Sequence, residues 1–174
     1  LLSEGRPLWV IAELGISYAG GVDAPLSIKL EESNDLLFRI NHSDSRFVVV
    51  SKQQLPKIRK ILADTPQVER VIVLDDLAEY GEKEMGISDF IALGKKFLAE
   101  NEPLLTERSA SIGPDDYANI SYTSGTTADP KGVVLTHRNY TANVEQGSSV
   151  INIGKGDVML ILLPLDHCFA HVAG

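Results

Sequence analysis

Cysteine is almost absent from this 174-residue chain, because Cys168 is the only one. A single thiol cannot build an internal disulfide framework or a four-cysteine zinc site, so we expect a reducing compartment, with the cytoplasm as the default location. Basic residues are also few: 16 Lys and Arg stand against 24 Asp and Glu, which gives a formal charge of −8. Because polyphosphate strands need a basic face, this balance argues against a nucleic-acid partner.

Long apolar runs are missing as well. The longest, at 158–163, ends at Pro164 and is far too short for a transmembrane segment. The N-terminus has neither a basic start nor a sustained apolar stretch, so it does not resemble a signal peptide. A composition of 44% hydrophobic and 23% charged residues suits one α/β-sized domain. Because the chain lacks an initiator methionine and stops without a polar tail, we expect it to be part of a longer protein.

Strand-like and helix-like segments alternate along the chain. Continuous apolar runs at 46–50 and 71–74 predict strands that are buried on both faces. Ser33, Ser51 and Ser88 each precede residues with helical apolar spacing, and we interpret them as helix caps. Because Pro56 does not suit a start at Ser51, we expect that helix to begin nearer Leu55. The alternation predicts an α/β fold with a largely parallel β-sheet covered by helices.

Several local expectations complete this prediction. We expect a helix at 8–14 that closes near Gly15, a charged loop at 81–86 and a turn at 113–116. Phe90, Leu93 and Phe97 have the spacing of core residues on a helix. Strands are predicted on both sides of residues 123–131, followed by a helix at 137–150 and a last strand at 158–163.

The most informative segment is the hydroxyl-rich loop between two predicted strands. It consists of Thr123, Ser124, Gly125, Thr126 and Thr127, and Lys131 follows four residues later. Such a loop offers hydroxyl and backbone N–H donors with little side-chain bulk, which a polyphosphate requires, and the lysine adds a positive charge. A serine- and threonine-rich surface turn is the alternative interpretation. A Walker A loop is disfavoured, because Pro130 precedes the lysine, Gly132 follows it, and the next segment is strand-like.

The sequence from Tyr122 to Val133 resembles the phosphate-loop signature of the adenylate-forming enzymes, the superfamily of acyl-CoA synthetases, luciferases and peptide-synthetase adenylation domains. Residues 163–174 resemble the next motif of the long-chain acyl-CoA synthetase branch, and residues 11–26 resemble an upstream segment. The resemblance implies that residues 1–174 are an incomplete part of the N-terminal AMP-binding domain. The rest of that domain and a small C-terminal domain would then lie outside this chain.

The resemblance implies an acid–thiol ligase of the long-chain fatty acid–CoA ligase type. The substrates would be ATP, a fatty acid and coenzyme A, with Mg²⁺ as the metal. An acyl-adenylate forms first and is then converted to acyl-CoA. The isolated 174 residues would not turn over, since the family's glutamate for magnesium, aspartate for ribose and adenylating lysine lie beyond Gly174. Alternatives are adenylation of an aryl, amino or short-chain acid, and a non-catalytic nucleotide-binding fragment.

The resemblance also assigns roles to individual residues. Lys131 and Thr123 would be catalytic, Thr123 would contact the metal, and His167 would border the substrate pocket. The nucleotide-binding residues would be Tyr122, Thr123, Ser124, Gly125, Thr126, Thr127, Lys131 and Gly132. The family usually has glycine where this chain has Ala128, which would cost about 1 kcal/mol if that position needed a positive φ.

Other candidates have simpler interpretations. His167 could be a strand-end histidine bonded to backbone, and His167, Cys168 and His171 are too few ligands for a metal site. The adjacent carboxylates at 75–76 and 115–116 are expected to be solvated turns. The sequence leaves oligomeric state open, and it leaves room for peripheral membrane contact by the full protein.

Overall fold

The structure is a computed structural model that describes residues 1–123, 130–151, 154–158 and 164–166. Its strands are β1 (Phe47–Val50), β2 (Arg70–Val73), β3 (Glu84–Gly86), β4 (Tyr117–Thr123) and β5 (Lys131–Thr136). Its helices are α1 (Pro7–Tyr18), α2 (Ser33–His42), α3 (Leu55–Ile61), α4 (Ile87–Glu100), α5 (Glu102–Ser111) and α6 (His137–Val150), with a 3-10 turn at Leu62–Asp64.

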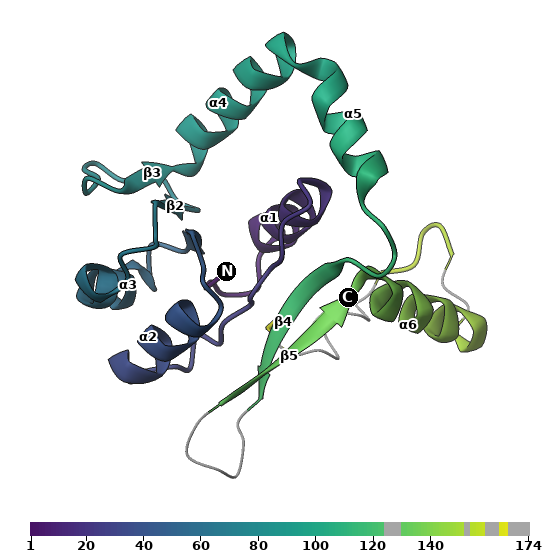
Figure 1. Ribbon diagram of the computed structural model, residues 1–174, viewed down its shortest axis with the longest axis horizontal. Coiled ribbons are helices and arrows are strands. Elements are labelled where there is room, and N and C mark those ends of the chain that lie inside the picture. Colours follow the sequence, from purple (N-terminus) through teal and green to yellow (C-terminus); the bar gives the residue numbers. More distant parts are fainter. Residues whose placement is uncertain (124–129, 152–153, 159–163, 167–174) are drawn as a thin grey trace.

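The first three strands form a parallel sheet in the order β1-β2-β3, with helices on both faces (Figure 1). Val48 and Val50 join the apolar cluster beneath α2 and α3, whereas Val49 packs against a second cluster that contains Trp9 of α1. The α/β class and the two-sided burial of β1 are therefore confirmed. The exception is Phe47 at the strand's start, which is 54% exposed.

The ends of two helices differ from the expectation. Helix α1 continues through Gly15 to Tyr18, and the chain turns away at Gly20, where φ is +72°. A helical glycine costs about 1 kcal/mol without breaking the helix, and the positive φ marks where the helix stops. Ser33 is the first residue of α2 and not its cap, because Glu32 occupies that position.

Ser88 does not cap α4, and Ser51 is not the N-cap residue of α3 although its hydroxyl accepts from Gln54 N. Helix α3 begins at Leu55 with Gln54 as its N-cap, and the Gln54 amide donates to Glu4 Oε1 at 2.7 Å. Ser88 lies inside α4 and its hydroxyl donates to Asp76 Oδ2 at 2.7 Å. The Ser88 hydroxyl is therefore taken by a partner distant in sequence, whereas the Ser51 hydroxyl accepts from Gln54 N at 3.4 Å within the turn before α3.

The region from residue 81 to 111 holds more regular structure than expected. Residues 84–86, predicted as loop, form β3, and helix α5 was not foreseen. Helix α4 leads away from β3, and α5 returns from its far end (Figure 1). Its predicted core residues are partly exposed, at 45%, 55% and 49% for Phe90, Leu93 and Phe97, so the expectation of burial is wrong for this chain.

Strands β4 and β5 form a separate antiparallel hairpin that leads directly into α6 (Figure 1). The two strands and the helix at 137–150 confirm the sequence prediction, although the pairing departs from the parallel pattern. Both strands are less buried than expected, because only Ala118 and Asn119 of β4 are buried and no residue of β5 is. The predicted strand at 158–163 lies almost entirely outside the described residues.

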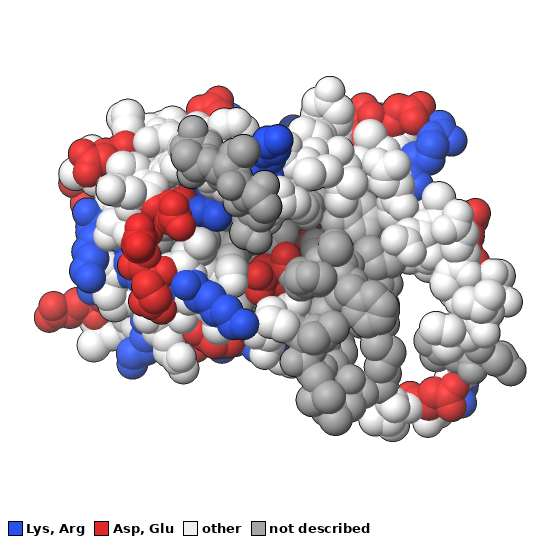
Figure 2. Space-filling model, turned by 90° about the horizontal axis from the view of Figure 1, so that it is seen from below, with Lys and Arg blue, Asp and Glu red and all other residues white. Residues whose placement is uncertain are grey.

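Charges of both signs share the molecular face seen in Figure 2. Ion pairs in the described part of the chain include Arg46 with Glu69 at 2.7 Å and Arg59 with Glu84 at 2.7 Å. In the part of the chain that the structure describes, no helix is both long and apolar enough to cross a membrane.

Candidate functional site

The hydroxyl-rich loop is held between the two strands of the hairpin. Thr123 lies opposite Lys131, and Tyr122 lies opposite Gly132. Residues eight positions apart in the sequence therefore become direct neighbours, with the hydroxyl and the ammonium on one face of the hairpin. The remaining predicted phosphate contacts, Ser124, Gly125, Thr126 and Thr127, lie outside the described residues, and so does Ala128.

Lys131 is exposed at the start of β5. In the part of the chain that the structure describes, the Lys131 ammonium forms no ion pair with a carboxylate. A flexible, hydrated ammonium next to a threonine hydroxyl is suited to an anionic ligand.

Tyr122 fixes the end of β4 against the last turn of α2. Its hydroxyl donates to the Arg39 carbonyl at 3.2 Å and lies 2.9 Å from His42 Nδ1. The Arg39 guanidinium carbon sits 5.7 Å from the centre of the tyrosine ring. Burial raises the pKa of the Tyr122 hydroxyl, although a hydrogen bond with Ser43 and the charge of Arg39 oppose this. The hydroxyl therefore stays protonated at neutral pH and can act as a donor.

Gly132 is required by close packing and not by backbone strain. A Cβ at this position would lie 3.0 Å from Ile120 Cγ2, 3.4 Å from Tyr122 Cε1 and 3.5 Å from His42 Cε1. The absence of a side chain lets the tyrosine and the histidine approach β5. Gly132 thus shapes the base of the loop, which is a different task from contacting a nucleotide.

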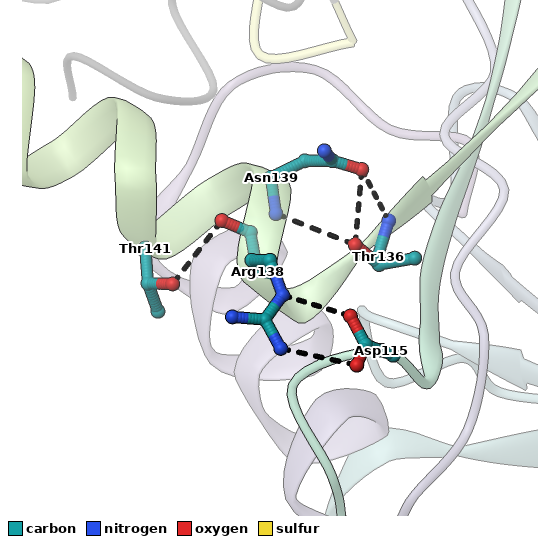
Figure 3. Close-up of polar contacts among 5 residues, drawn as sticks. All are labelled: Asp115, Thr136, Arg138, Asn139 and Thr141. Carbon is teal, nitrogen blue, oxygen red and sulfur yellow. Dashed lines mark hydrogen bonds and ion pairs between the residues drawn. The ribbon is translucent and has the colours of Figure 1, made fainter.

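The opposite end of the hairpin is held by polar contacts at the start of α6 (Figure 3). Arg138 donates to both oxygens of Asp115 at 2.8 and 3.0 Å. Its hydrogen bond lowers the pKa of the Asp115 carboxyl. Thr136 and Asn139 form a capping box that starts α6. The turn before β4 and the helix after β5 are therefore joined.

A parallel bridge connects the hairpin to the rest of the chain. Ile120 N donates to the Asp23 carbonyl at 2.8 Å, and Asp23 N donates to the Ala118 carbonyl at 3.0 Å. This bridge places Asp23 beside β4, although nearly a hundred residues separate the two in the sequence.

The adjacent carboxylates have structural partners. Asp75 accepts from Arg6 at 3.0 Å and from Lys52 N at 2.8 Å, and Asp76 accepts from Ser88. Asp116 accepts from Gly113 N at 2.7 Å within the predicted turn. Each carboxylate is therefore used to hold a turn or a strand end, and none of these pairs is arranged for acid–base chemistry.

The substrate-pocket candidate His167 and the neighbours Cys168 and His171 lie outside the described residues. Among the residues that are described, no three His, Cys, Asp or Glu side chains gather as a metal site. The structure does bring together Tyr122, Thr123, Lys131 and Gly132. It adds Arg39 and His42, which the sequence reasoning missed because neither belongs to a recognisable motif.

Comparison with solved structures shows that this fold is shared with known proteins. The natural red-emitting luciferase from Phrixothrix hirtus matches with a TM-score of 0.77 and 21% identity, over 98% of this chain and 32% of the luciferase. The chain belongs to the family of AMP-binding enzymes, whose family model matches residues 1–174.

Curated relatives in this family are acyl-CoA ligases. The peroxisomal long chain acyl-CoA synthetase 6 of Arabidopsis thaliana is 32% identical over 94% of this chain and 23% of its own length. The peroxisomal acyl-CoA ligase 891 of Penicillium brevicompactum is 30% identical over 99% of this chain and 26% of its own length. This chain therefore spans about a quarter of the length of these relatives.

Proposed function

We propose that the protein to which this chain belongs activates a fatty acid with ATP and transfers it to coenzyme A. The observation that carries the proposal is the pairing of Thr123 with Lys131 at the ends of the hydroxyl-rich loop. Membership of the AMP-binding family and the acyl-CoA ligase relatives support it. A long-chain acid is the proposed substrate class, following the relative that is named as a long chain acyl-CoA synthetase.

The proposed reaction has two steps. A carboxylate oxygen of the fatty acid attacks the α-phosphorus of ATP, the bond to the β-phosphate oxygen breaks, and pyrophosphate leaves. The thiol of coenzyme A then attacks the acyl carbon, loses its proton, and expels AMP. The first step converts a poor acyl donor into a mixed anhydride with a good leaving group.

The loop would act on the phosphates in the first step. Ser124, Gly125, Thr126 and Thr127 would bind the β- and γ-phosphates through hydroxyl and backbone donors, and Lys131 would stabilise the charge that grows on pyrophosphate. Tyr122 and Gly132 would shape the base of the loop, and His167 would border the acyl pocket.

Magnesium is part of the proposal through Thr123. Its exposed hydroxyl is a hard oxygen ligand that could reach the ion directly or through water, with phosphate oxygens as further ligands. Asp115, before β4, is engaged with Arg138. When bound with ATP, the ion would neutralise phosphate charge.

The cellular location remains a proposal. The cytoplasm is the expectation from the scarcity of cysteine, whereas the two relatives named above are peroxisomal proteins. Imaging of the tagged full-length protein separates these compartments.

Pyrophosphate exchange tests the function. The full-length protein is incubated with ATP, labelled pyrophosphate and a panel of long-chain, short-chain, aryl and amino acids. We expect exchange to depend on long-chain fatty acids and acyl-CoA to form when coenzyme A is added. Exchange with another class of acid would reassign the substrate. No exchange with any acid, together with ATP binding by calorimetry, would indicate a non-catalytic nucleotide-binding protein.

A further inference from the structure

The last turn of α2 carries a cluster that reaches the hairpin from 80 residues away in the sequence. His42 stacks on Phe38 with ring centres 5.2 Å apart and meets the edge of Tyr122 at 5.8 Å. Arg39 of the same turn is 8% exposed and faces the tyrosine ring. The cluster therefore joins one helix end to the strand that enters the loop.

Hydrogen counting fixes the direction of the hydrogen bonds in this cluster. A tyrosine hydroxyl carries one hydrogen, and here it lies beside the Arg39 carbonyl, which can only accept, and His42 Nδ1, which can accept or donate depending on the tautomer. Both contacts are satisfied only if the hydroxyl donates to the carbonyl and His42 Nδ1–H donates to the hydroxyl oxygen. The chain of donors thus runs from His42 through Tyr122 to the Arg39 carbonyl, which also accepts from Ser43 N at 3.0 Å at the end of α2.

The position of the cluster links it to the loop ends. Tyr122 directly precedes Thr123, and Gly132 directly follows Lys131, so the tyrosine and the glycine form the last pair before the pair at the loop. We call the contacts of Tyr122 with Arg39 and His42 the Tyr122 anchor. Side chains alternate along a strand, which places this anchor on one face of the hairpin and the Thr123 hydroxyl on the other. A shift of Tyr122 therefore moves Thr123 and its partner Lys131.

We propose that His42 is a positioning residue for the phosphate-binding hairpin. It orients Tyr122 by donating a hydrogen bond from Nδ1, and thereby holds Thr123 and Lys131 in the arrangement that receives ATP. This inference rests on the proposed function, because it assigns His42 a task in nucleotide binding. His42 itself touches neither substrate nor metal in this account.

Kinetics of full-length variants test the proposal. Without the anchor, a smaller fraction of molecules holds the binding-competent arrangement, which weakens apparent affinity in proportion. We expect His42→Ala to raise the KM for ATP about threefold to tenfold, the effect of one lost hydrogen bond, and to change kcat less than about twofold. His42→Asn keeps an N–H donor near the Nδ1 position and should restore most of the affinity. His137→Gln, a histidine at the start of α6, is the matched control.

Tyr122→Phe removes the hydroxyl through which His42 acts. Combined with His42→Ala, it should add little to the single variants, since both interrupt the same chain of hydrogen bonds. Additive effects of the two substitutions, or equal KM values for His42→Ala and wild type, would overturn the proposal.

Hydrogen–deuterium exchange separates this inference from the proposed function. In the full-length protein without ATP, His42→Ala should speed exchange in peptides covering 117–123 and 131–136, and His42→Asn should not. Unchanged exchange in His42→Ala would contradict the anchor even if the protein activates fatty acids. Faster hydrogen–deuterium exchange in His42→Ala, in a protein that shows no pyrophosphate exchange with any acid, would support the anchor and contradict the proposed function.

Discussion

The parallel sheet and the antiparallel hairpin are stabilised in different ways. Val48, Val50, Val71 and Val73 of the parallel sheet are at most 4% exposed and belong to one apolar cluster. In the hairpin, Val133 and Val134 are 44% and 48% exposed. Burial of apolar surface holds the first region, whereas strand pairing and polar contacts at three places hold the second.

The difference bears on where chemistry is proposed to occur. A loop that binds ATP must leave its donors free for the ligand, so it cannot itself be part of a packed core. The hairpin carries the loop on regular strands and is attached through the Asp23 bridge, the Tyr122 anchor and the Arg138–Asp115 pair. Stability and ligand binding should therefore respond to different substitutions.

The largest effect on stability should come from the core of the first region. Ile58 of α3 is 1% exposed within the main apolar cluster. Ile58→Ala should lower the free energy of unfolding by about 2–5 kcal/mol, because it removes buried methyl groups and leaves a cavity. Urea unfolding of the full-length protein measures the loss, and the KM for ATP of the folded protein should stay unchanged.

Two matched variants on the same helix sharpen this prediction. Ile58→Val should cost only about 0.5–1.5 kcal/mol, and the exposed Lys60→Ala should be within about 0.5 kcal/mol of wild type. An Ile58→Ala variant that unfolded like wild type would contradict the contribution of this buried side chain, and one that lost ATP affinity while fully folded would show that the two regions are not separable.

The hairpin should show the reverse pattern. Lys131→Ala should lower kcat/KM for ATP about 10- to 100-fold, since one charge-assisted hydrogen bond is worth roughly 1.5–3 kcal/mol. Because Lys131 is exposed, the unfolding midpoint should barely move. Lys96→Ala on α4 is the control for loss of a surface charge, and an unchanged KM and rate in Lys131→Ala would contradict the assignment.

Local sequence patterns predicted the helices and strands whose defining residues lie close together in the sequence. The β-branched runs gave β1 and β2, and helical spacing gave α2 and α6. Strand β3 has only three residues, Glu84–Gly86, inside a charged and glycine-flanked stretch, so its pattern is that of a loop. It forms because its backbone pairs with β2 and its glutamate meets Arg59, contacts that no local window contains.

The same limit applies to the candidate site. The composition of residues 122–132 pointed to the loop, because hydroxyl, glycine and lysine residues at that spacing are rare in a simple turn. The anchor could not be predicted, since His42 and Tyr122 are 80 residues apart and His42 ends an otherwise ordinary amphipathic helix. The prediction of Ser88 as a helix cap failed for a related reason, since its hydroxyl donates to Asp76, a residue outside the helix.

The smallest effect expected here tests whether a polar contact contributes to the apolar region. Glu84 of β3 accepts from Arg59 Nε and Nη2, each at 2.7 Å, and from Gly81 N at 2.8 Å. The Arg59 hydrogen bond, which outweighs the opposing effect of burial, lowers the pKa of Glu84 below its usual value. Glu84→Gln should cost about 1 kcal/mol at pH 7, a value reduced because Arg59 is half exposed.

The pH dependence of that loss follows from the lowered pKa of Glu84. A carboxyl whose pKa is depressed on folding contributes its full stability above the unfolded pKa of about 4.3 and loses it as the pH falls toward the folded value. The difference in Tm between wild type and Glu84→Gln should therefore be constant from pH 7 to about pH 5.5 and shrink at lower pH. Glu82→Gln, an exposed neighbour, should follow wild type throughout. A pH-independent difference would mean that Glu84 acts through the shape of the β3 turn and not through its charge, and β3 would then be held by backbone pairing alone.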